Sequence, residues 1–298
     1  MKQREYMIEL FLKYLQYEKN YSSHTVLSYS NDLNEFTQFI QHNVSEEFNP
    51  LEIHSDMIRQ WVVTLMKEGM SPRSVNRKIS AVKSFYRFLT KRGMATVNPT
   101  KKINSLKTEK NLPLFFKETE MENALTPCEE DSDFENYRNR LIIAMFYETG
   151  IRLSELIEIK DSDIDLSAKT VKVLGKRNKQ RIIPFGDRLC NDIIMYKQMR
   201  DSETKSPVRL FIRKGGEKMY PKLVYQIVHN AMSEQSSLIK RSPHVLRHTF
   251  ATSILNSGAD INAVKELLGH ANLAATQVYT HTTFEQLRNI YKQAHPRA

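Results

Sequence analysis

Apolar side chains recur at helical spacing through the first hundred residues, and this periodicity is the feature that most constrains the fold. Four stripes follow one another: Met7, Phe11, Tyr14 and Leu15; Val26, Tyr29, Leu33, Phe36 and Ile40; Ile58, Trp61, Val62 and Leu65; and Val75, Ile79, Val82, Phe85, Tyr86 and Leu89. Each stripe lies along one face of a helix. Ser23 and Ser71 are suitable N-caps, Pro72 suits a first helical position, and Gly69 and Gly93 suit helix ends. The pattern predicts a small four-helix domain.

The helical pattern gives way to a mixed pattern in the second half. Asn98-Pro99 ends the first helical region, and residues 100–116 are typical of an extended basic linker. Residues 170–174 and 181–185 alternate as strands do, around a polar turn at 175–180.

A helix is clearest at Tyr137 to Glu148, and helices resume near Tyr220. We therefore expect a mainly α (α+β) fold, with a helical domain at 1–105, a basic linker at 106–117 and a mixed, mostly helical domain at 118–298.

Composition narrows the class of protein. A length of 298 residues suits about two domains, and a net charge of +10 favours a polyanionic partner, although an ordinary basic enzyme is equally compatible with the charge alone. Two cysteines, Cys128 and Cys190, argue against a disulfide framework and against a cysteine zinc cluster. The N-terminus does not have the pattern of a signal peptide, and no apolar run approaches the ~20 residues of a membrane helix. The expected location is the cytoplasm.

One stretch carries a single sign of charge. Residues 71–108 contain no acidic side chain but ten basic ones: Arg73, Arg77, Lys78, Lys83, Arg87, Lys91, Arg92, Lys101, Lys102 and Lys107. A solvated helix face usually mixes both signs, although a plain basic surface is the simpler interpretation. We expect this helix and linker to lie on the phosphates of a nucleic acid, with Arg73, Arg77, Lys78, Lys83 and Arg87 as contacts.

Six residues of the second half could together attack a phosphodiester without a metal: Arg152, Lys176, His244, Arg247, His270 and Tyr279. Arginines clamp non-bridging oxygens with two parallel hydrogen bonds. Histidine and lysine can transfer or share protons, and a tyrosine hydroxyl can be the nucleophile.

Five of these six residues also have a simpler interpretation when each is taken alone. Arg152 and Glu155 are spaced as a surface ion pair. His244 and His248 form half of a zinc-helix pattern, but Val245 stands where that pattern has its glutamate. His270 follows a glycine that suits a helix C-cap, and Lys176 lies in a solvated basic turn. Tyr279 is one of 13 tyrosines.

The order and spacing of these motifs resemble those of the tyrosine recombinases, the phage integrase family, and within it the bacterial Xer recombinases. The resemblance begins at Ser23-x-x-Val26-x-x-Tyr29-x-x-Asp32-Leu33-x-x-Phe36, continues from Ser71 to Leu89 and ends at His295-Pro296-Arg297-Ala298. It implies a four-helix, SAM-like core-binding domain that binds DNA, followed by a catalytic domain with a small β-sheet.

The resemblance also implies roles. The two arginines would grip the scissile phosphate, His244 and His270 would hydrogen-bond it, Lys176 would protonate the leaving 5′ oxygen, and Tyr279 would attack. Glu155 and His248 would support the site, and neither a metal nor a cofactor is implied. Two departures from the family pattern are Arg177, where glycine is common, and Ala274-Ala275, where small hydroxyl residues are common.

The implied function is site-specific DNA recombination through a 3′-phosphotyrosyl intermediate, of the Xer type that resolves chromosome dimers. Four protomers, all alike or shared with a second recombinase, would hold two double-stranded DNA sites. Alternatives are an integrase or invertase of a mobile or phase-variable element, a type IB topoisomerase, and a DNA-binding protein that has lost activity. A final apolar stripe, Phe284, Leu287, Ile290 and Tyr291, packs either on its own domain or on a neighbouring protomer.

Overall fold

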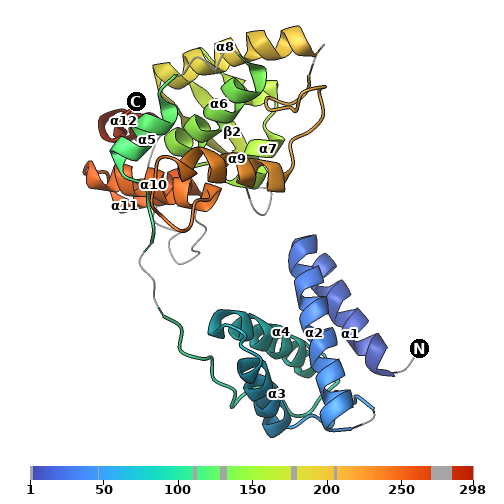
Figure 1. The fold of residues 1–298 in the computed structure, drawn as a ribbon. Helices are drawn as coiled ribbons and strands as arrows, with labels where there is room; N and C mark the ends of the chain where they lie inside the picture. The colour runs from blue at the N-terminus through green and yellow to red at the C-terminus, as the bar shows by residue number, and fades with distance from the viewer. Residues whose placement is uncertain are drawn as a thin grey trace. The chain divides into compact units, whose positions relative to one another are not determined.

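The structure, a computed structural model, describes residues 3–45, 47–109, 113–127, 133–175, 180–204, 207–269 and 284–297, with the backbone alone at 3–5 and 284–287. It is mostly helical and contains one three-stranded sheet (Figure 1), which confirms the predicted α+β class. The chain divides into two compact units, residues 1–111 and 112–298. No helix within the described ranges is long and apolar enough to cross a membrane.

The N-terminal unit is helical. Its elements are α1 (Gln3–Lys13), a π-helical turn (Tyr14–Glu18), α2 (Ser23–Asn43), α3 (Ser55–Lys67) and α4 (Pro72–Lys91). The predicted apolar stripes meet in one core around Phe11, Phe36 and Trp61. The cap of α4 is Ser71, as expected, but the cap of α2 is Ser22 rather than Ser23, since the Ser22 hydroxyl accepts from the Thr25 amide at 3.3 Å.

The segment after α4 stays attached to the N-terminal unit for several residues. Ile103 is buried in its core. The Asn76 side chain of α4 pairs with the backbone of Leu106 in both directions, at 2.9 Å to its carbonyl and 2.7 Å from its amide. Part of the segment expected to be an extended linker is therefore packed.

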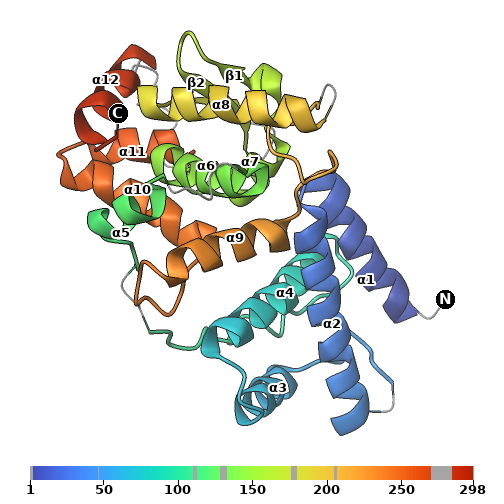
Figure 2. The same ribbon diagram turned by 45° about the horizontal axis from the view of Figure 1, so that its top comes forward.

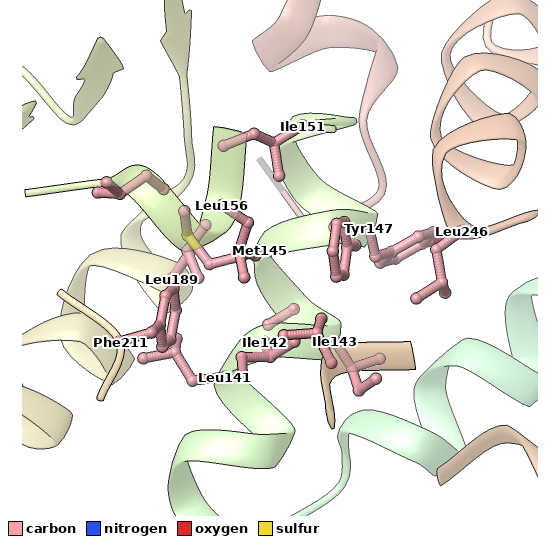
Figure 3. Close-up of a cluster of buried hydrophobic side chains, with 14 of the residues drawn as sticks. Leu141, Ile142, Ile143, Met145, Tyr147, Ile151, Leu156, Leu189, Phe211 and Leu246 are labelled. Atoms are coloured by element: carbon pink, nitrogen blue, oxygen red, sulfur yellow. The ribbon is translucent and has the colours of Figure 1, made fainter. Parts of the chain in front are cut away.

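The second unit is built around one buried helix. Its elements are α5 (Glu118–Leu125), α6 (Phe134–Thr149), α7 (Leu153–Glu158), a 3₁₀ turn (Asp161–Asp163), β1 (Ile164–Asp165), β2 (Thr170–Leu174), β3 (Gln180–Pro184), α8 (Asp187–Glu203), α9 (Pro221–Ser233), α10 (Pro243–Asn256), α11 (Ile261–Leu268) and α12 (Phe284–Ala294). Figure 2 shows α6 between α8 on one side and α9 and α10 on the other. Side chains from all sides of α6 join the core, which includes Leu141, Ile143 and Met145 (Figure 3).

The sheet follows the predicted strands closely. β2 pairs antiparallel with β3, with Val171 opposite Ile183 and Val173 opposite Arg181. The two-residue strand β1 adds an edge that the alternation did not predict. Helix α8 was also missed, because its buried face mixes apolar residues with Arg200, whose guanidinium pairs with Asp161 through two bonds of 2.7 Å.

Helix α12 packs on its own unit. Tyr291 is buried with residues of α10 and α11, and its ring stacks on His295 at 5.2 Å. The His295 imidazole is 3.1 Å from the Tyr147 carbonyl of α6. Ile290 and Tyr291 therefore favour docking within one chain, while the side chains of Phe284 and Leu287 lie outside the described ones.

The buried imidazole of His295 predicts a pH effect on stability. Burial lowers its pKa from 6.5 to about 4, while the Tyr147 carbonyl opposes the shift. As the pH falls, His295 is protonated near pH 6.5 in the unfolded chain but only near pH 4 in the folded protein. The free energy of unfolding therefore decreases between about pH 6.5 and pH 4. We expect the wild type to lose about 3 kcal/mol more than His295→Phe across this window, as measured by urea unfolding.

Comparing the wild type with His295→Phe separates the effect of His295 on stability from that of Glu148, a nearby residue whose effect has the opposite sign. Burial raises the pKa of Glu148, which lies beside Arg297, to about 8, so Glu148 stabilises the folded state as the pH falls from about 8 to 4.5. Parallel stability curves for wild type and His295→Phe would contradict the prediction.

Candidate active site

A tight turn between α6 and α7 positions Arg152. Helix α6 ends at Thr149, and the residue after it, Gly150, has a left-handed backbone with φ of +58°. A Cβ atom at this position would lie 2.8 Å from Phe250 Cε1 and 2.9 Å from Leu268 Cδ2. The turn therefore requires glycine both for its backbone angle and for the close approach of α10 and α11.

We expect Gly150→Ala to lower the free energy of unfolding by about 2–4 kcal/mol, because it adds a strained backbone angle to an overpacked contact. The matched control is Gly258→Ala, at φ of +87° with nothing within 4 Å of the added Cβ. This control should cost only about 1 kcal/mol. Equal losses in the two variants, measured by denaturant unfolding, would show that the contact with Phe250 and Leu268 contributes nothing.

Arg152 caps α7 and is held by Glu155. The Glu155 carboxylate accepts from the Arg152 backbone amide and from Arg152 Nη1, each at 2.8 Å. Arg152 Nη2 donates to the Gly269 carbonyl at 3.0 Å. Glu155 is buried, and Arg152 is partly buried with a further bond to another element, so the pair is not the ordinary surface ion pair that its spacing also allowed.

Arg247 is more enclosed than Arg152, the other predicted phosphate-binding arginine. It lies on α10 and is 7% exposed. Its Nη1 donates to the Gly150 carbonyl and its Nη2 to the Leu268 carbonyl. Arg247 thus ties the turn before Arg152 to the end of α11.

Three arginines from different elements converge on the C-terminal end of α11. Arg181 Nε donates to the Leu267 carbonyl at 2.9 Å, Arg247 to Leu268, and Arg152 to Gly269. The last carbonyls of a helix have no partners within it and carry partial negative charge, so they suit cationic donors. The next residue along the chain is His270.

The cluster carries an excess of positive charge. It contains three guanidinium groups, of Arg152, Arg181 and Arg247, and one carboxylate, of Glu155, which binds the first two. Burial lowers the pKa of Arg247 to about 9, and the charges of Arg152 and Arg181 act in the same direction. Arg247 remains protonated at neutral pH, and the repulsion among the three cations would be relieved by an anion.

The Glu155 carboxylate stays ionised in this setting. Burial alone would raise its pKa, but hydrogen bonds and charge from Arg181, with bonds from Arg152, overcome burial and lower it to about 2. Glu155 therefore keeps both arginines bound across the physiological pH range.

The two histidines of α10 contact each other. His244 Nε2 and His248 Nε2 are 3.1 Å apart, so one ring donates and the other accepts. Burial, followed by the charges of Arg247 and Lys240, lowers the pKa of His248, which favours its neutral form. His248 is therefore placed to orient His244.

The described ranges contain no group of three or more His, Cys, Asp or Glu side chains that could hold a metal ion.

The structure brings together part of the predicted set. Arg152 and Arg247 meet at the end of α11, Glu155 holds Arg152 there, and His244 lies on the same helix as Arg247. Lys176, His270 and Tyr279 lie outside the described residues.

Arg181 was not predicted as a site residue, although the sequence carried a signal for it. Opposite Val173 and two residues before Ile183, it shares the inward face of β3 with apolar side chains. An arginine at an inward strand position needs a carboxylate partner, here Glu155 from α7.

The basic helix α4 does not present all its predicted DNA contacts. Arg73 and Arg87 are exposed, and Lys83 is half-buried. Lys78 is buried and pairs with Asp32 and Glu35 of α2, while Arg77 pairs with Asp32. Lys78 therefore does not fit the prediction, because its charge is already neutralised within the unit.

Comparisons with known proteins cover almost the whole chain. Residues 115–286 match the phage integrase family, and residues 8–93 match the phage integrase N-terminal SAM-like domain. The tyrosine recombinase XerC of Bacillus pumilus (strain SAFR-032) is 36% identical over 100% of this chain and 99% of the relative. XerC of Staphylococcus aureus (strain USA300 / TCH1516) is 38% identical over 97% and 96%.

Solved structures share the fold. The XerH site-specific recombinase bound to a palindromic difH substrate is 21% identical, with a TM-score of 0.69 over 95% of this chain and 93% of that one. The Tn1549 transposon integrase, in complex with a circular intermediate DNA, is 18% identical, with a TM-score of 0.71 over 96% and 99%.

Proposed function

This chain belongs to the phage integrase family, and on that premise we propose that it is a site-specific DNA recombinase that cuts and rejoins DNA through a 3′-phosphotyrosyl intermediate. In the proposed step Tyr279 loses its hydroxyl proton to water, and the phenolate oxygen attacks the scissile phosphorus in line. The bond from phosphorus to the 5′ oxygen breaks as the bond to tyrosine forms. The phosphodiester energy is retained in the new bond, so rejoining needs no ATP.

The other residues of the set stabilise charge and transfer protons. Arg152 and Arg247 bind the non-bridging oxygens, and His244 and His270 donate hydrogen bonds to them. Lys176 gives a proton to the leaving 5′ oxygen. An ordinary tyrosine has a pKa of about 10, and nearby cations favour its phenolate form.

The observation that carries this proposal is the arrangement of Arg152, Arg181 and Arg247 at the end of α11. It places three guanidinium groups beside one carboxylate, an excess of positive charge that suits an anion, and in the sequence His270 is the next residue and Tyr279 follows nine residues later. Bidentate guanidinium groups match the geometry of a phosphodiester.

We propose that the wider role is Xer-type chromosome dimer resolution in the cytoplasm. The support is the full-length similarity to several proteins named tyrosine recombinase XerC. The proposed partner is double-stranded DNA, held by the N-terminal domain through exposed residues of α4 and by the catalytic domain. Four protomers, all of this chain or shared with a second recombinase, would hold two sites.

The test is to recover and sequence the genomic DNA that is covalently attached to the full-length protein. We expect one enriched site, with the protein attached at 3′ ends. An enriched site near the replication terminus supports dimer resolution, whereas a site beside a mobile element or an invertible promoter replaces that role with integration or inversion. Recovery of no site-enriched adduct overturns the proposal.

A plasmid carrying two copies of the recovered site then separates recombination from topoisomerase activity. Recombinant circles are expected. Relaxation of the plasmid without any recombinant product would instead indicate a type IB topoisomerase-like enzyme.

A further inference from the structure

We propose that Arg181 is a positioning residue for DNA cleavage, which holds Arg152 through the Glu155 carboxylate and fixes the end of α11 on which Arg152 also rests. This inference rests on the function proposed above, in which Arg152 binds the scissile phosphate. It assigns a role to a residue outside the six-residue catalytic set.

The contacts of Arg181 are those of a fixed side chain. Its Nη1 and Nη2 donate to Glu155 Oε1 and Oε2 at 2.7 and 2.8 Å, a bidentate pair. Its Nε donates to the Leu267 carbonyl at 2.9 Å. The two side chains are 12% and 3% exposed, so water screens the pair only weakly.

Glu155 connects Arg181 with Arg152. Its carboxylate accepts four hydrogen bonds, two from Arg181 and two from Arg152. Arg181 therefore fixes the orientation of the Glu155 carboxylate, and in that orientation the carboxylate holds the Arg152 guanidinium. Without Arg181, the carboxylate could rotate toward Arg152 and draw that guanidinium out of place.

Arg181 also fixes the end of α11. It bonds the Leu267 carbonyl, and its side chain lies close against Gly269, where an added Cβ would be 3.2 Å from Arg181 Cδ. Gly269 supplies the carbonyl that Arg152 uses. Arg181 thus acts on Arg152 from two directions, through Glu155 and through the helix end.

The location of Arg181 gives it a third connection. It is the second residue of β3, the strand that follows the segment containing Lys176. One side chain therefore joins that strand to α7 and to the segment that leads to His270. Three of its five N–H donors serve Glu155 and Leu267 and fix its guanidinium between them, so we assign it the role of positioning other groups.

The first test compares Arg181→Lys with Arg200→Lys on a duplex carrying the recovered site, nicked so that the covalent adduct accumulates. Arg200 is the matched control, because it is buried even more deeply, at 1% exposure, and also binds a carboxylate, that of Asp161, with two bonds of 2.7 Å. Its other acceptors are Asp201 and the carbonyls of Arg209 and Leu210, none of which belongs to the site. Lysine keeps the charge in both variants but cannot form the bidentate pair.

We expect Arg181→Lys to slow adduct formation by about 100-fold, because a small displacement of a phosphate-binding group has this effect. DNA affinity should remain at the wild-type value. Arg200→Lys should lower the melting temperature yet cleave at the wild-type rate below it. If Arg181→Lys slows cleavage no more than Arg200→Lys does, the proposal is overturned.

A double variant tests whether Arg181 acts through Glu155. If it does, Arg181→Lys with Glu155→Gln should be about as slow as the slower single variant, because both changes break the same connection. If the fold-decrease of the double variant equalled the product of the two single fold-decreases, Arg181 would act independently of Glu155. That result would overturn the proposal that Arg181 acts through Glu155.

A crystal structure of Arg181→Lys separates failure of this inference from failure of the proposed function. The Arg152 guanidinium is expected to leave the Gly269 carbonyl, whether or not the wild type forms a DNA adduct. An unmoved Arg152 would overturn the positioning role even in an active recombinase.

Discussion

Replacing Tyr279 by phenylalanine is expected to abolish the covalent protein–DNA adduct while leaving the affinity for DNA unchanged. The change removes one oxygen, which in the proposed step is the atom that bonds to phosphorus. It removes no positive charge, so the salt-dependent part of the DNA affinity should remain. The measurement is a denaturing gel of protein incubated with a nicked duplex of the recovered site, beside a binding isotherm on the same duplex.

The matched control is Tyr225→Phe, which removes the hydroxyl of an exposed tyrosine on α9. This variant should form the adduct at the wild-type rate. An adduct that persists in Tyr279→Phe would mean that another side chain is the nucleophile. If Tyr279→Phe instead lost its affinity for DNA, weak binding would explain the missing adduct, and the prediction would be contradicted.

Replacing Arg247 by lysine is expected to slow adduct formation by about 1,000-fold, the effect of removing one preorganised donor to developing charge. The guanidinium reaches two carbonyls, of Gly150 and Leu268, from one rigid plane and can still direct further N–H groups at an anion. An ammonium cannot reproduce that fork, and two buried carbonyls would compete for it. Single-turnover formation of the adduct with saturating protein is the measurement.

Saturating protein ensures that this comparison reports the chemical step rather than DNA binding. The melting temperature of Arg247→Lys is needed beside it, because the lost carbonyl contacts should also destabilise the fold, and cleavage should be followed well below that temperature. A folded Arg247→Lys protein that cleaves within about tenfold of the wild-type rate would contradict the role of Arg247 as a phosphate clamp.

The parts of the fold that were predictable are those set by local periodicity. The apolar stripes of α2, α3 and α4 and the alternation of β2 and β3 are visible over a few residues, and the structure confirms them. Helix α8 was missed because Arg200 occupies a buried position, which only Asp161, distant in sequence, makes acceptable. The π-helical turn at Tyr14–Glu18 leaves no recognisable pattern either.

In the site, too, the residues within local motifs were predictable and the contacts between distant segments were not. The sequence motifs identified Arg152, Glu155, His244 and Arg247, whose contacts the structure describes. They did not reveal that three arginines bind the carbonyls at the end of α11, or that Arg181 is one of them. Charge along the sequence also misled at Lys78, because the neutralising Asp32 and Glu35 come from another helix. Contacts between distant segments decide such cases.

The most direct test of the central claim is to map the attachment site of the DNA on the protein. The adduct is digested with nuclease and protease, and the peptide that carries a nucleotide is sequenced by mass spectrometry. The proposed mechanism predicts a single modified peptide, with the 3′ phosphate of the nucleotide on Tyr279. A nucleotide on any other residue, or one joined through its 5′ phosphate, would contradict it.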